Sequence, residues 1–81
     1  MARVLLFGPL RDLAGWRERD IEGGAASVAA LRDLLGVEDA DLGEALRAPG
    51  VQVAVNQAIV RGDAALAVDC EVAFLPPMSG G

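Results

Sequence analysis

Residues 71–81 read EVAFLPPMSGG, and this stretch constrains both the fold and the functional site. Glu71 to Leu75 combines β-branched, aromatic and other apolar residues, which predicts a final strand. Pro76-Pro77 follows at once, and because proline has no backbone N–H to donate, the sheet should end there. Met78 to Gly81 ends in two glycines, whose backbone angles are little restricted. We therefore expect a domain over residues 1–77 and a flexible tail over residues 78–81.

The remaining patterns predict more strands and one main helix. The apolar run Val4 to Phe7 is typical of a buried strand, and Ser27 is a good N-cap for a helix whose apolar stripe continues to Gly36, where we expect it to end. Short helices are predicted from Pro9 and from Asp41, which has capping-box spacing to a glutamate. Further strands are expected over residues 17–22, 51–55 and 58–60. This order predicts an α+β domain.

Composition limits the classes of function that the domain can have. The chain has 81 residues, 53% of them hydrophobic, which predicts one small folded domain. Seven arginines against twelve carboxylates give a net charge of −5, which argues against nucleic acid or a membrane as a partner. Without His and with one Cys, the chain lacks Ser-His-Asp and Cys-His catalysis, His/Cys zinc sites and an internal disulfide. The lone cysteine and the lack of a signal or spanning segment predict a cytoplasmic protein.

The alternation of side chains along the strands predicts an exposed apolar patch. If Val4 and Phe74 point toward the main helix, Phe7 and Leu75 belong to the opposite face of the sheet. We see no element that would cover that face, so Phe7, Leu75 and Ile59 should form an interaction surface. The alternative is that a minor element covers the patch.

The C-terminal residues offer a second candidate site. Fully extended, Met78 to Gly81 would reach roughly 13–14 Å. Such a slender segment suits a narrow channel in another protein, where it would present its α-carboxylate. The alternative is a frayed end made of small residues.

Four segments carry a resemblance to a known family. They are VLLF at 4–7, LRDLAG at 10–15, VNQ at 55–57 and EVAFLPPMSGG at 71–81. In order, spacing and total length they resemble the small subunit of molybdopterin synthase, the MoaD family. Thiazole-pathway sulfur carriers also end in Gly-Gly but are usually shorter and lack the Phe-Leu-Pro-Pro run. This chain differs from the family at Leu75, which is usually aromatic, and at Asp69-Cys70-Glu71, where Gly-Asp-Glu is common.

The resemblance implies a ubiquitin-like β-grasp fold, with a mixed sheet and one main helix packed on one face, and a sulfur-carrier role. In that family an E1-like adenylyltransferase uses ATP and magnesium to adenylate the C-terminal glycine, here Gly81. Sulfur from a persulfide enzyme then replaces AMP and leaves a thiocarboxylate. Inserted into the large subunit of a heterotetrameric synthase, the tail donates sulfur to cyclic pyranopterin monophosphate. The residues that position Gly81 are Pro76, Pro77, Met78, Ser79 and Gly80.

The same resemblance places partner contacts at Phe7, Ile59 and Leu75 and implies no cofactor or metal bound by this chain. Two other functions stay open from the residues: a carrier for thiazole or another thiolated metabolite, and a ubiquitin-like protein modifier.

Cys70 has two interpretations, a redox or thioester site and a structural residue before the last strand. No basic residue near it in the sequence favours a thiolate.

Overall fold

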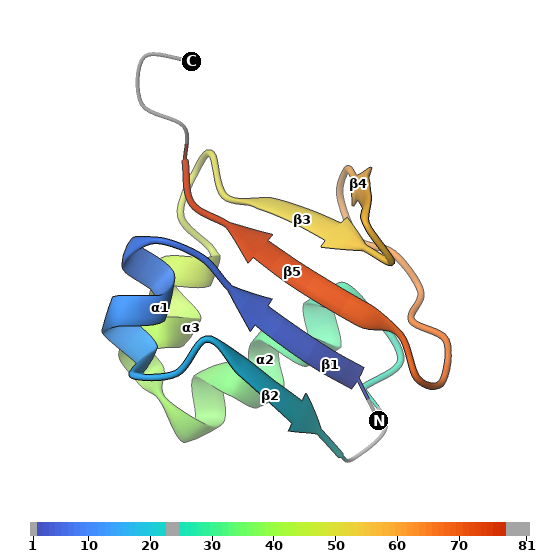
Figure 1. The fold of residues 1–81 in the computed structure, drawn as a ribbon, viewed down its shortest axis with the longest axis horizontal. Coiled ribbons are helices and arrows are strands. Elements are labelled where there is room, and N and C mark those ends of the chain that lie inside the picture. The colour runs from blue at the N-terminus through green and yellow to red at the C-terminus, as the bar shows by residue number, and fades with distance from the viewer. Residues whose placement is uncertain (1, 23–24, 78–81) are drawn as a thin grey trace.

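The computed structural model describes residues 2–22 and 25–77, which form a five-stranded sheet and three helices. The strands are β1 (Ala2–Leu6), β2 (Glu18–Ile21), β3 (Gln52–Val55), β4 (Ala58–Val60) and β5 (Glu71–Leu75). The helices are α1 (Pro9–Ala14), α2 (Val28–Glu38) and α3 (Ala40–Leu46). The sheet order is β2-β1-β5-β3-β4, with β1 and β5 parallel and the other pairs antiparallel. Figure 1 shows α2 and α3 behind this mixed sheet, which confirms the predicted α+β class.

The core lies between the sheet and α2. Every second side chain of β1 and β5 faces the helices, and apart from Ala2, which is 9% exposed, these residues are at most 2% exposed. Their apolar partners come from α2 and α3. The set from the two strands is Val4, Leu6, Val72 and Phe74, and the set from the two helices is Val28, Leu31, Leu35, Leu42 and Leu46. The predicted inward face of the sheet is therefore confirmed.

Two hydrogen bonds to side chains fix the first turn of α2. The Ser27 hydroxyl accepts a hydrogen bond from the Ala30 N–H at 3.1 Å, as expected of an N-cap. The carboxylate of Asp63, far away in the sequence, accepts a second one from the Ala29 N–H at 2.9 Å. The loop before β5 is thereby tied to the first turn of the main helix.

The predicted end of α2 at Gly36 is wrong, because the helix continues to Glu38. Gly36 lies inside the helix, where it faces Gly43 of α3 at a very close crossing. A Cβ built on Gly43 would lie 2.6 Å from the Gly36 Cα. The close approach of the two helices requires that Gly43 has no Cβ, and Gly36, an interior residue of α2 at this contact, does not mark a helix end.

The predicted start of α3 at Asp41 is also displaced. The N-cap is Asp39, whose carboxylate accepts a hydrogen bond from the Leu42 N–H at 3.1 Å. Asp39 has extended backbone angles and also ends α2, so a single residue joins the two helices. Asp41 lies within the first turn instead. The capping-box spacing identified the segment and misplaced its cap by two residues.

The connections on either side of β4 use left-handed backbone at polar residues. Asn56 and Gln57, the predicted turn between β3 and β4, have φ of 49° and 70°. Asp69, at the position where the resembling family commonly has Gly, has φ of 60°. Aspartate tolerates this conformation better than most residues, so the turn keeps a glycine-like geometry without glycine.

Candidate functional site

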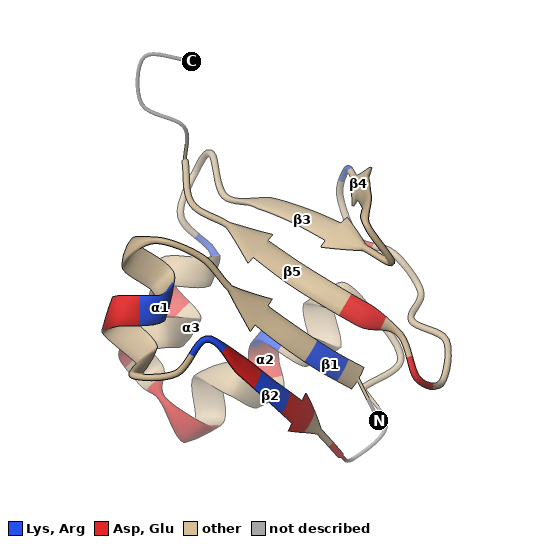
Figure 2. Cartoon of the chain, viewed as in Figure 1, with Lys and Arg blue, Asp and Glu red and all other residues tan. Residues whose placement is uncertain are grey.

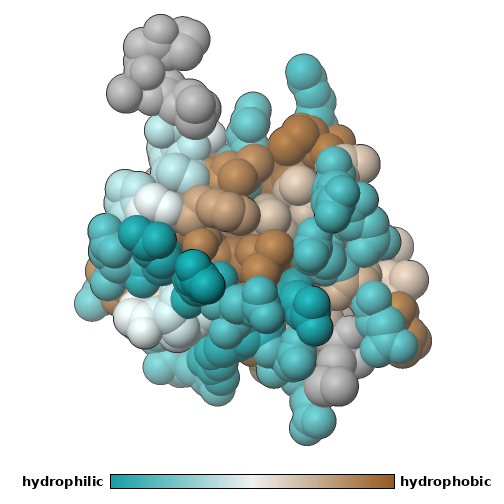
Figure 3. Space-filling view, viewed as in Figure 1, coloured by the Kyte–Doolittle hydropathy of each residue, from teal (hydrophilic) through white to brown (hydrophobic). Residues whose placement is uncertain are grey.

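One face of the sheet lacks a covering helix in the described part of the chain (Figure 1). We call this face, opposite α2, the open face. Its middle row crosses four strands, because Leu5 pairs with Ala73, Ala73 with Ala54, and Ala54 with Ile59. Figure 3 shows hydrophobic surface across the middle of this face. The row places two small alanines between two larger side chains, a shape suited to receiving apolar groups from another molecule.

The three residues predicted to form an interaction surface lie on the open face or at its end. Ile59 is 53% exposed and Phe7, directly after β1, is 44% exposed. Leu75 is half-buried and pairs with Gln52 of β3. No helix of residues 2–22 and 25–77 covers them, and exposed apolar side chains such as Phe7 and Ile59 are typical of binding surfaces. Their contact with a partner stays a prediction.

Charged residues are confined to the other end of the central strands. Arg3 and Glu71 lie at the starts of β1 and β5, and β3 has no charged residue, as Figure 2 shows. Arg3 is held by carboxylates of β2, with its Nε 3.5 Å from Asp20 and 3.9 Å from Glu18. The ends of the three central strands nearest Pro76 therefore carry no charge, whereas the opposite ends of β1 and β5 are charged.

Two glycines with positive φ flank the point where the chain leaves the sheet. Because β5 lies between β1 and β3, its carboxyl end is next to the loop after β1 and the loop before β3. Gly8 has a φ of 57° and lies close to Pro76. A Cβ added to Gly8 would lie 3.2 Å from the Cγ of Pro76. Gly50, with φ of 89°, would place a Cβ 3.0 Å from the Cβ of Pro77. The two prolines therefore start the terminal segment from a packed position between two loops.

Met78, Ser79, Gly80 and Gly81, the predicted tail with its terminal carboxylate, lie outside the described residues. The two residues directly before them in the sequence are described: Pro76 is half-buried and Pro77 is exposed. The expected flexibility of the tail stays a prediction.

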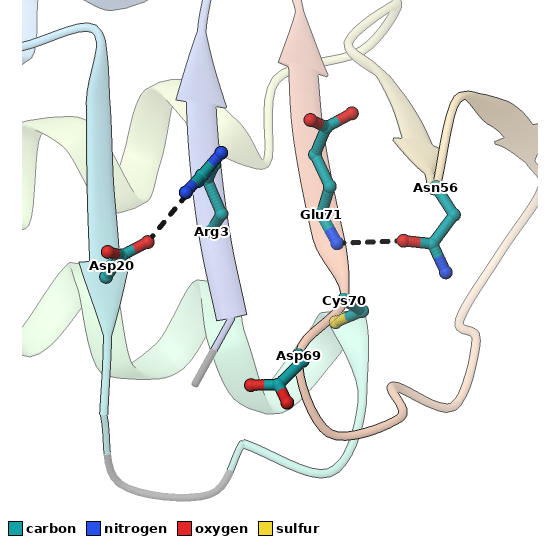
Figure 4. A pocket seen from close by; sticks show the side chains of 6 residues that line it. All are labelled: Arg3, Asp20, Asn56, Asp69, Cys70 and Glu71. Carbon is teal, nitrogen blue, oxygen red and sulfur yellow. Dashed lines mark hydrogen bonds and ion pairs between the residues drawn. The ribbon is translucent and has the colours of Figure 1, made fainter.

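A polar pocket, not predicted from the sequence, lies at the end of the sheet opposite to Pro77. It has a volume of about 320 Å³ and is lined by Arg3, Asp20, Asn56, Asp69, Cys70 and Glu71 (Figure 4). Its groups bind one another: the Asn56 amide oxygen accepts the Glu71 N–H at 2.9 Å, and Arg3 contacts Asp20. The first of these contacts holds the turn after β3 against β5 and the second joins β1 to β2, so both have a structural role.

Cys70 packs in the core and is 3% exposed. Its backbone carbonyl accepts a hydrogen bond from the Arg3 N–H at 2.9 Å, which fixes the start of β5 beside β1. This position favours the structural interpretation, since a reactive thiol needs access to its reactant. Within residues 2–22 and 25–77, no cluster of three or more His, Cys, Asp or Glu residues is arranged to hold a metal ion. No helix in this part of the chain is long and apolar enough to span a membrane.

Comparison with known proteins assigns the architecture to a family. The model of the ThiS family matches residues 4–81, nearly the whole chain. The chain belongs to the ThiS family. This ThiS-family chain is 35% identical to the molybdopterin synthase sulfur carrier subunit of Escherichia coli (strain K12) and 32% identical to that of Haemophilus influenzae. Both alignments cover all 81 residues and the full length of each relative, which confirms the resemblance seen in the sequence.

Solved structures agree with the fold of this ThiS-family chain. SAMP1 from Haloferax volcanii superposes with a TM-score of 0.79 at 25% identity, over 99% of this chain and 98% of the other. Molybdopterin converting factor, subunit 1, from Pyrococcus furiosus also gives 0.79, at 28% identity over 95% and 97% of the two chains. The predicted ubiquitin-like β-grasp fold is therefore confirmed.

Proposed function

We propose that this chain is the sulfur carrier subunit of a molybdopterin synthase. The observation that supports it most is the similarity to two sulfur carrier subunits of that enzyme, in alignments that cover all 81 residues. The structure adds an apolar open face that leads to Pro76 and Pro77, beside the uncharged ends of β1, β3 and β5. The chain then acts as a protein cosubstrate, and partner enzymes supply the general acids and bases of the reaction.

In this proposal the reactive group is the carboxylate of Gly81. A carboxylate is a poor electrophile, so an E1-like adenylyltransferase first joins it to the α-phosphate of ATP, with magnesium, and pyrophosphate leaves. A persulfide sulfur then attacks the acyl carbon and AMP leaves, and a thiol reduces the resulting acyl disulfide to the thiocarboxylate. Division of one difficult exchange into such steps is the usual logic of covalent catalysis.

The partner that consumes the sulfur is the large subunit of the synthase. The open face, with Phe7, Ile59 and Leu75, docks on it, and Pro76 to Gly80 pass the thiocarboxylate into its active site. There the sulfur attacks cyclic pyranopterin monophosphate, and two successive transfers form the dithiolene of molybdopterin. The packed prolines reduce the number of directions in which the segment can leave the domain, which lowers the entropy lost on insertion.

Intact mass spectrometry tests this proposal. The chain is incubated with the adenylyltransferase, ATP, magnesium and a persulfide donor, and we expect the mass increase of one oxygen exchanged for sulfur. Deletion of Gly81, or one alanine appended after it, should abolish the increase and molybdopterin formation while circular dichroism shows an unchanged fold.

Other outcomes of this experiment identify the alternatives. Molybdopterin formation by the extended variant contradicts the mechanism. A sulfur adduct that the pterin-converting large subunit cannot use indicates a carrier for thiazole or another metabolite. An isopeptide-linked product without sulfur indicates a protein modifier.

A further inference from the structure

A cationic groove lies between α2 and the β3–β4 hairpin, beside the open face. Its volume is about 470 Å³, and Arg32 of α2 and Arg61, directly after β4, are among its lining residues. Gln52, Ile59, Val60 and Gly62 contribute to the wall, and no carboxylate is among the described residues that line it. The groove therefore gathers two positive charges in a chain whose net charge is −5.

The two arginines differ from most others in this chain. Arg3, Arg11, Arg19 and Arg47 each form an ion pair with an aspartate or glutamate of the same chain. Within residues 2–22 and 25–77, Arg32 and Arg61 form none, although carboxylates outnumber arginines twelve to seven. Among the described residues, no carboxylate therefore compensates these two charges.

Arg32 is held by an aromatic ring instead of a carboxylate. Its guanidinium carbon lies 5.9 Å from the centre of the Phe74 ring. Its Nε is enclosed and has no acceptor, the single case of this kind among the described side chains. A rotation of the guanidinium toward an incoming oxyanion would give this donor a partner, and planar guanidinium groups bind carboxylates through two parallel hydrogen bonds.

The groove is continuous with the open face, because Ile59 belongs to both. A protein that covers Ile59 therefore meets Arg61 at the margin of the same contact. The middle of the open face has no charge that could set the rotation of one protein on the other, whereas charges at the margin of an apolar contact steer association and fix its register.

We propose that this groove receives carboxylate side chains of the protein that docks on the open face and so orients the carrier on it. This inference rests on the proposed function, in which that protein is the large subunit of molybdopterin synthase. The apolar face supplies most of the affinity, and the pair of arginines selects the orientation in which the residues after Pro77 point into the partner.

Binding of the purified chain to the purified large subunit tests the inference, with rates measured at about 50 mM and about 500 mM salt, where screening differs strongly. Arg61→Glu should weaken binding about tenfold at low salt, mainly through slower association, and less at high salt. Arg17→Glu is the matched control, because Arg17 is exposed, lies beside the other edge strand and forms no ion pair among the described residues. We expect it to bind within twofold of the unaltered chain. Equal losses in the two variants, or none in either, overturn the inference.

Two further measurements separate this inference from the proposed function. Ile59→Ser should weaken binding at both salt concentrations; if it does not, or if the unaltered chain fails to bind, the proposed docking itself is wrong. The arginine Nε–H resonances are then followed by NMR with the large subunit and, separately, with inorganic phosphate. A shift of the Arg32 resonance on complex formation supports the inference. Saturation by millimolar phosphate alone contradicts it, because the groove would then be a site for small anions.

Discussion

Gly43→Ala should destabilise this domain, whereas the same change at Gly36 should stabilise it. Both glycines lie within helices and face each other where α2 crosses α3, so their substitution by alanine improves helix propensity equally, by about 0.5–1 kcal/mol. The geometry of the contact differs. A Cβ on Gly43 would lie 2.6 Å from the Gly36 Cα, but a Cβ on Gly36 would lie 3.4 Å from the Gly43 Cα.

The expected magnitudes follow from these two distances. Carbon atoms pack at about 3.5–4.0 Å, so Gly43→Ala requires α2 and α3 to separate by about 1 Å. This movement loosens the leucines that both helices contribute to the core, and such overpacking costs about 1–3 kcal/mol. With the gain in helix propensity subtracted, the middle of these ranges leaves a net loss of about 1 kcal/mol. Gly36→Ala needs almost no movement and should gain about 0.5–1 kcal/mol.

Thermal unfolding followed by circular dichroism at 222 nm measures the difference. For a domain of this size, 1 kcal/mol corresponds to about 4–8 °C in Tm. We expect the Gly43 variant to melt about 4–8 °C below the unaltered chain and the Gly36 variant about 2–8 °C above it. Equal melting temperatures for the two variants would refute the close crossing, since propensity alone treats the two positions alike.

Two further comparisons test local features. Asp39→Ala should cost about 1 kcal/mol in urea unfolding, because its carboxylate caps α3, whereas Asp41→Ala should cost less than half as much; equal losses contradict the assignment of the cap. Gly50→Ala and Gly15→Ala both force alanine into left-handed backbone, φ of 89° and 82°, at about 1–2 kcal/mol. Only the former meets Pro77, whereas Gly15 has open space around it, so Gly50→Ala should be the more destabilising and should alone shift NMR resonances around Pro77.

Most elements of the fold were predictable because their signals are local. The last strand matches its predicted bounds, Glu71 to Leu75, since Pro76-Pro77 stops the ladder directly after it. Ser27 caps the main helix, and Asn56-Gln57 forms the turn, where its residue types indicated them. In each case the residue that stabilises or ends the local structure is also the residue whose type predicts it.

The predicted helix ends were wrong where a residue type typical of a helix end is explained by the packing of two helices. Gly36 has the residue type of a helix end but lies inside α2, where it packs against Gly43 of α3. Asp41 has the spacing of a cap, but the sharp connection at Asp39 places the cap earlier. Neither contact can be deduced from a window of a few residues, since both depend on how two helices cross.

Part of the candidate site was also predictable from local patterns in the sequence. The order of apolar and polar residues along the strands predicted that Phe7, Ile59 and Leu75 lie away from the main helix, because alternation is a property of the strand itself. The family, too, was recognisable from residues 71–81 and their spacing to the earlier segments.

By itself, then, the sequence determined the elements, the two faces of the sheet and the family, all of which depend on periodicity and on residue type. Only the tertiary structure decided which loops approach Pro76 and Pro77 and which arginines share a groove. Those neighbours come from distant parts of the chain, and the packing of β5 between β1 and β3, with α2 behind them, brings them together.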